Sequence, residues 1–115
     1  MTIEEFVIDY LETALSVPVS GDVPHPMPPS FVTVEKTGSG RTNKIESATL
    51  AVQSWAMSRA EAAALNETVK TALLNIITHN EISRSELDSD YNYTDEDTKR
   101  FRYQAVFDLV HFLGG

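Results

Sequence analysis

The residues best suited to chemistry lie in an acidic stretch towards the end of the chain. Asp88, Asp90 and Asn92 stand at alternate positions, like the first ligands of a calcium-binding EF-hand loop. That loop also needs a glycine at its sixth position and a glutamate at its twelfth, where this chain has Tyr93 and Lys99. We therefore expect no calcium site, and interpret residues 88–97 as a solvated acidic loop or an acidic docking surface.

A second stretch, residues 38–44, contains Gly38 and Gly40 followed by Arg41 and Lys44. A phosphate-binding loop would need Lys-Ser/Thr after the second glycine and a helix behind it, so that backbone N–H groups and the helix dipole meet the anion. Here the pattern predicts a strand instead. We interpret the stretch as a seven-residue flexible hairpin tip, whose two cations either contact a partner or have no role.

The three histidines, His25, His79 and His111, have no metal-ligand partner three or four residues away and no neighbouring serine in a nucleophile motif. The chain has no cysteine, which excludes disulfides, thiolate zinc sites and a cysteine nucleophile. We expect no catalytic residue, no bound metal and no cofactor, and therefore no enzyme.

The elements that position these residues follow from periodicity. Residues 1–16 are predicted to form a helix, because Thr2-x-x-Glu5 is a capping box and the apolar residues recur every three to four positions. Residues 17–30 hold all five prolines, which predicts an extended strap across the surface. Residues 31–57 alternate as a β-hairpin.

Similar capping and periodicity signals appear in the second half of the chain. Ser58-x-x-Glu61 is another capping box, and it opens a predicted helix over residues 58–79, with Asn66, Glu67 and Lys70 pointing away from the apolar stripe. Residues 82–113 are predicted to supply two more strands, the first of them a short or irregular edge strand. The order α-β-β-α-β-β predicts one domain, residues 1–115, of the two-layer α+β class, with two helices on one face of a largely antiparallel four-stranded sheet.

Charge and hydropathy narrow the classes of function. The net charge is −8, which argues against nucleic-acid binding as the main task. The N-terminus is acidic and lacks the apolar core of a signal peptide, and no apolar run approaches the length of a membrane helix. We expect a protein of the cytosol, or of something assembled there, with no membrane partner.

Trp55 is unusual because it falls on the polar face of its predicted strand. It could pack beneath a loop or the proline-rich strap. It could instead contact another subunit, because tryptophan is enriched at interfaces.

Three segments together resemble the tail terminator, or tail completion, proteins of long-tailed bacteriophages and their prophage relatives. The first is Phe31-Val-Thr-Val-Glu-Lys-Thr-Gly38 after the proline-rich strap. The second is Leu50-Ala-Val-Gln-Ser-Trp-Ala56 followed by Ser58-Arg-Ala-Glu-Ala62, and the third is Arg102-Tyr103-Gln104 at the start of an aromatic-rich final strand. The resemblance spans nearly the whole chain.

The resemblance implies an α+β protein without catalytic activity that assembles as a hexameric ring. Such a ring caps the tail tube, ends its polymerisation and presents a surface to the head–tail connector proteins. The partners would be further copies of the chain, the tail tube protein and the connector. The location would be the virion tail, after assembly in the bacterial cytoplasm. An acidic ring would let DNA pass without binding it specifically.

Two alternatives remain open: a related head–tail joining or minor tail adaptor protein, and a small enzyme or ligand-binding domain. For the assembly role we expect a basic hairpin tip on one subunit to meet the acidic loop of the next. The candidate interface residues are Gly38, Gly40, Arg41, Lys44, Trp55, Asp88, Asp90, Tyr91 and Asp95.

Overall fold

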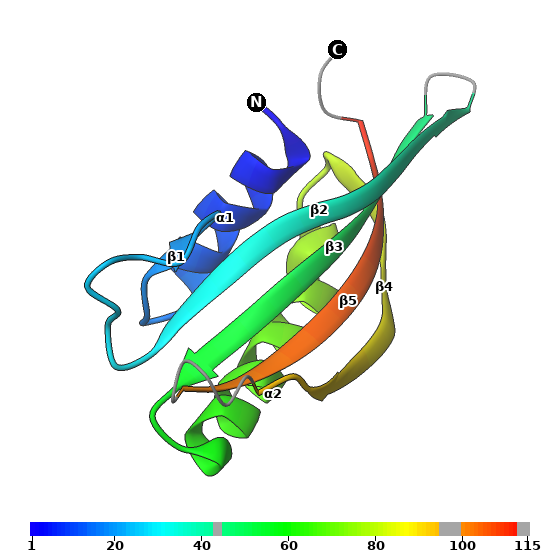
Figure 1. The fold of residues 1–115 in the computed structure, drawn as a ribbon. Helices are drawn as coiled ribbons and strands as arrows, with labels where there is room; N and C mark the ends of the chain where they lie inside the picture. The colour runs from blue at the N-terminus through cyan, green and yellow to red at the C-terminus, as the bar shows by residue number, and fades with distance from the viewer. Residues whose placement is uncertain (43–44, 95–99, 113–115) are drawn as a thin grey trace.

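Two helices lie on the same face of a twisted β-sheet (Figure 1). The computed structural model describes residues 1–42, 45–94 and 100–112. Its elements, in chain order, are α1 (Ile3–Ala14), β1 (Val19–Ser20), β2 (Phe31–Thr42), β3 (Ile45–Ala56), α2 (Arg59–Leu74), the 3-10 turn η1 (Asn75–Thr78), β4 (Ile82–Asn92) and β5 (Phe101–His111).

The sheet has five strands in the order β1-β2-β3-β5-β4 and is mixed, so the predicted four-stranded sheet and the α-β-β-α-β-β order are wrong. The additional strand, β1, lies within the proline-rich strap and pairs in parallel with β2, with Val19 opposite Val32. Proline lacks an N–H but keeps its carbonyl, and the Pro18 carbonyl accepts the Val32 N–H at 2.9 Å. The sequence did not indicate this strand, because only two residues without proline form it inside a proline-rich segment.

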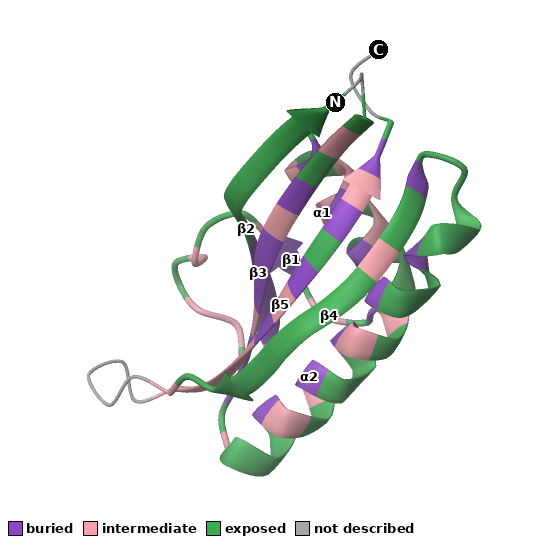
Figure 2. Ribbon diagram, turned by 90° about the vertical axis from the view of Figure 1, so that its right-hand side faces the viewer, coloured by how far each residue is buried: buried purple, intermediate pink, exposed green. Residues whose placement is uncertain are grey.

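The edge strand β4 is longer than the sequence indicates. It runs for eleven residues and pairs with β5 throughout, with register shifts between Ile82 and Arg84 and between Leu87 and Ser89. Each shift changes which side chains face the helices, so the alternation of apolar and polar residues is lost although the backbone ladder continues. Figure 2 shows that β4 is exposed along most of its length.

Both helices begin where capping residues predict. At α1 the predicted capping box is confirmed: Thr2 Oγ1 accepts the Glu5 N–H, and the Glu5 carboxylate accepts the Thr2 N–H, each at 3.1 Å. At α2 the Ser58 hydroxyl accepts the Glu61 N–H at 3.2 Å, which is one of the two bonds of the predicted capping box. The α-helix ends at Leu74, and η1 continues it almost to the predicted end at His79.

The core lies between the helices and the sheet. The α1 stripe contributes Val7 and Leu11, and the α2 stripe contributes Val69 and Leu73. They pack on the inward residues of the three long central strands, and the largest of these are fully buried: Val34, Leu50, Val52, Phe107 and Leu109. Burial of this apolar surface holds the two layers together.

Candidate functional site

The far end of the β2–β3 hairpin projects from the layered body (Figure 1). We call residues 37–42 and 45–47 the contact arm. From Glu35 to Thr42 every residue of β2 is exposed. The arm is nevertheless regular, because β2 and β3 remain paired as far as Thr42 opposite Ile45, with one register shift near Thr37. The predicted flexible connection from Gly38 onward is therefore wrong for residues 38–42, which extend the strand.

The arm carries one described cation, Arg41, whose side chain is 73% exposed and forms an ion pair with Glu46 across the hairpin. The hydrogen bond from Arg41 lowers the pKa of the Glu46 carboxyl. Gly38 and Gly40 both lie within β2, and a Cβ at Gly40 would come 3.1 Å from Ser47 Oγ. Lys44 lies outside the described residues.

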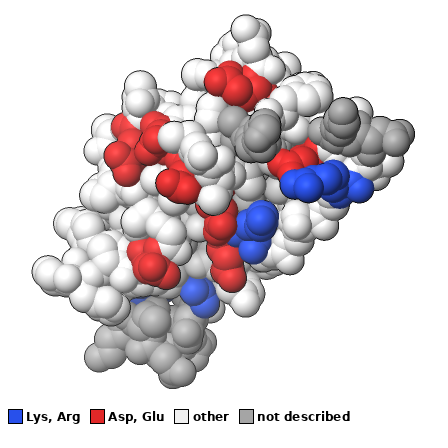
Figure 3. All heavy atoms as spheres, turned by 90° about the horizontal axis from the view of Figure 1, so that it is seen from above, with Lys and Arg blue, Asp and Glu red and all other residues white. Residues whose placement is uncertain are grey.

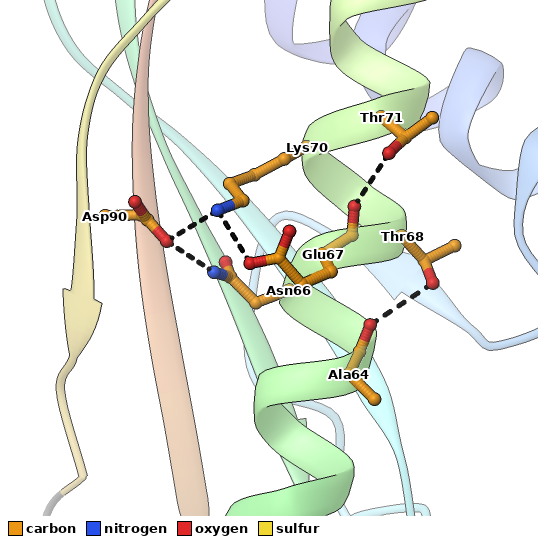
Figure 4. Close-up of polar contacts among 7 residues, drawn as sticks. All are labelled: Ala64, Asn66, Glu67, Thr68, Lys70, Thr71 and Asp90. Carbon is orange, nitrogen blue, oxygen red and sulfur yellow. Dashed lines mark hydrogen bonds and ion pairs between the residues drawn. The ribbon is translucent and has the colours of Figure 1, made fainter.

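Of the predicted acidic loop, residues 88–92 are strand. Asp88, Asp90 and Tyr91 all belong to β4, while Asp95 lies outside the described residues. The Asp90 carboxylate turns towards α2, where it accepts hydrogen bonds from Asn66 Nδ2 at 3.0 Å and Lys70 Nζ at 2.9 Å (Figure 4). This carboxylate is therefore engaged within the monomer rather than free for a partner.

The same contacts correct the prediction that Asn66 and Lys70 point away from the core. Asn66 is only 1% exposed, and its Oδ1 has no hydrogen-bond partner among the residues that the structure describes. Lys70 also bonds Glu67 at 2.8 Å, and its bonds to Glu67 and Asp90 raise the pKa of its amine. Asn66 and Lys70 are four residues apart, so they lie on the same side of α2, at the edge of its apolar stripe. This side faces inward only because β4 packs beside it.

Trp55 lies on the sheet face opposite the helices and is 2% exposed. Its ring stacks on Phe31 with centroids 5.2 Å apart, and the Arg102 guanidinium lies 4.7 Å from its centroid. The indole N–H donates to Thr33 Oγ1 at 3.2 Å. Arg102 also covers Tyr93 at 4.6 Å. These contacts form an aromatic row across the sheet and account for the burial of Trp55 within one chain.

A polar row lies beside this aromatic row. Gln53 Nε2 donates to Gln104 Oε1 at 2.7 Å, and Gln104 Nε2 donates to the Tyr91 hydroxyl at 2.6 Å. Thr33 Oγ1 completes the row with a longer bond to Gln53, at 3.4 Å. The partners come from four strands, and sequence reasoning missed the set because only the strand register brings them into line.

A groove lies beside α1. Phe6 and Tyr10 each meet the His79 ring edge-on, with centroid distances of 5.7 and 5.2 Å. With Asp9 and Glu81 they line a hollow of about 540 Å³, completed by Met1, Thr13 and Ala14. Tyr10 is fixed by a 2.6 Å hydrogen bond from its hydroxyl to the Ala72 carbonyl, and burial raises its pKa. The sequence indicated His79 only as the end of a helix.

A second hollow, of about 470 Å³, lies at the base of the contact arm and includes His111 in its lining. His111 is 5% exposed, and its Nδ1 lies 3.8 Å from Glu46 Oε2 without a hydrogen bond. Burial lowers the pKa of this imidazole, and nearby Lys36 also lowers it, while Glu46 acts in the opposite direction.

Within residues 1–42, 45–94 and 100–112, no three His, Asp or Glu side chains gather in a way that could hold a metal ion. Over the same residues, no helix has both the length and the apolar character to cross a bilayer. No protein-family model matches this chain, and no curated protein matches it.

Proposed function

We propose that this protein is a structural component of a bacteriophage tail. In this role, copies of the chain form a closed ring, hexameric in the related proteins, that caps the tail tube, ends its polymerisation and offers a surface to the head–tail connector. The proposal rests on the resemblance of the three sequence segments, and one structural observation supports it: the contact arm.

The contact arm has no evident role in a protein that acts alone. The arm belongs to the larger sheet, because β3 pairs with β5 as far as Glu46 opposite His111. On the other side β1 pairs with Val32 and Thr33, so among the described residues the outer part of β2 is an edge of the sheet, and such an edge can pair with another chain. Here the outer eight residues of β2 are exposed, and Ile45 on β3 leaves 46% of its surface in solvent. An edge of this kind offers unpaired backbone N–H and C=O groups to a neighbouring protein.

The charge of the molecule is compatible with a ring through which DNA passes. Figure 3 shows acidic side chains spread over one end of the molecule, with basic ones in a few places beside them. The net charge of −8 disfavours the binding of phosphate groups to the molecule as a whole. The proposed role is one of assembly rather than catalysis, in the virion tail, with synthesis and assembly in the host cytoplasm.

The test combines the chain with a tail tube protein from the same genome. We expect negative-stain microscopy to show rings of the chain at tube ends, and tubes of fixed length when the chain is present during polymerisation. Unchecked tube growth with no ring would refute the proposal. Binding to connector proteins without any effect on tube length would instead identify a head–tail adaptor.

A further inference from the structure

The groove beside α1 has the chemistry of a cation site. Three aromatic rings, from Phe6, Tyr10 and His79, meet edge-on around it. Two exposed carboxylates, Asp9 and Glu81, stand at its border. Aromatic faces attract a cation through the ring quadrupole, and a guanidinium adds flat stacking to this attraction. The combination suits an arginine side chain better than an anion or a purely apolar group.

The described part of the chain does not fill this groove itself. Its lining comes from Met1, from α1, from His79 and from Glu81, and no described residue of the contact arm takes part. The rings are held in place rather than collapsed, because the Tyr10 hydroxyl is fixed to the Ala72 carbonyl. No lysine or arginine of the described residues lines the groove, so another copy of the chain can supply one.

Arg41 is the described cation best placed to do so. It lies on the arm that projects from the body, and its side chain is 73% exposed. Arg102 is held between Trp55 and Tyr93, and Lys70 is bound to Asp90 and Glu67. Arg84 is exposed and paired with Glu86 on β4. Lys36 and Arg59 are exposed too, but Lys36 lies on β2 inward of the arm, and Arg59 lies at the start of α2.

We propose that the groove beside α1 receives the Arg41 side chain of a neighbouring copy, an inference that rests on the proposed ring. In this contact, Arg41 leaves the carboxylate of Glu46 and binds the two carboxylates and three aromatic rings of the groove. The arm and the groove are different surfaces, so the contact is heterologous. Repetition of a heterologous contact builds a ring when its rotation closes.

The absence of cysteine from the chain permits a direct test by cross-linking. Thr42→Cys places a thiol next to Arg41 and leaves Arg41 in place, and Thr13→Cys places one at the border of the groove. In assembled rings, a short bis-maleimide should link a copy with Thr42→Cys to a copy with Thr13→Cys. The control partner is Thr68→Cys, on the exposed side of α2. Intact rings in which Thr42→Cys reacts equally with both partners, or with neither, would overturn the contact.

A charge reversal tests the chemistry. Arg41→Glu should weaken self-association at least tenfold, and Asp9→Arg in the same chain should restore much of it. Arg84→Glu, on an arginine whose side chain is 62% exposed, should leave self-association unchanged. If Arg41→Glu and Arg84→Glu chains assemble as well as the unmodified chain, the groove does not bind Arg41, although the ring itself stands. If the unmodified chain forms no ring with tail tubes, the proposed function fails instead.

Discussion

Asp90 links two layers of the molecule through one carboxylate, which accepts hydrogen bonds from Asn66 and Lys70 of α2. Asp90→Ala should therefore lower the free energy of unfolding by about 2 kcal/mol, because the buried Asn66 amide would lose its partner. Urea denaturation gives this value, and Asp88→Ala on the same strand is the control, expected to change stability by less than about 0.5 kcal/mol. Equal losses in the two variants would mean that the Asp90 contacts contribute nothing beyond a general effect of charge.

The helices are the elements whose limits depend most on single side chains. Ser58 holds the first turn of α2 through the Glu61 N–H, and α2 covers the middle of the sheet. Ser58→Ala should cost about 1 kcal/mol of stability, the usual effect of losing an N-cap. Thermal and urea unfolding measure it, with Ser39→Ala on the exposed arm as the matched serine control. The cap is unimportant if Ser39→Ala costs as much.

The strands are set less by their own residues than by their neighbours. β4 has few buried side chains, yet it forms an eleven-residue strand because β5 presents a full ladder of backbone groups to it. β1 forms for the same reason beside β2. Local propensity is thus a poor guide at both edges of the sheet, and a good one at its centre, where each strand is amphipathic.

The stability of the whole molecule should depend on pH through His111. Burial lowers the pKa of this imidazole in the folded state, whereas the unfolded chain retains the ordinary value of 6.5. Just below pH 6.5 the unfolded state therefore binds more protons than the folded state. As a result, the free energy of unfolding decreases as the pH falls through this value. Glu46, whose pKa is lowered by Arg41, loses its contribution only at more acidic pH, below its ordinary value of 4.5.

Urea midpoints measured between about pH 7.5 and pH 5.5 check this expectation. They should fall with pH in the unmodified chain and change less in His111→Gln, in which the buried ionisable ring is absent. The lining of the adjacent hollow also includes Glu46 and Lys36, so both charges stay in place in the variant. Identical slopes in the two proteins would assign the pH dependence to other groups.

The sequence by itself determined what depends on neighbouring residues along the chain. The capping signals at Thr2 and Ser58, the apolar stripes of α1 and α2, and the alternation of β3 and β5 all appear in the structure. Each of these is a short-range pattern with a fixed period, so a single segment contains the whole signal. The α+β class follows from them.

Only the tertiary structure decided what depends on strand register and on the edges of the sheet. The partners of Trp55, the polar row through Gln53 and Gln104, and the inward turn of Asp90 join residues from separate elements. The groove beside α1 is of the same kind, because His79 meets Phe6 and Tyr10 only after both helices pack on the sheet. A register shift of one residue would send the strand side chains of this set to the opposite face of the sheet, and no local pattern fixes that choice.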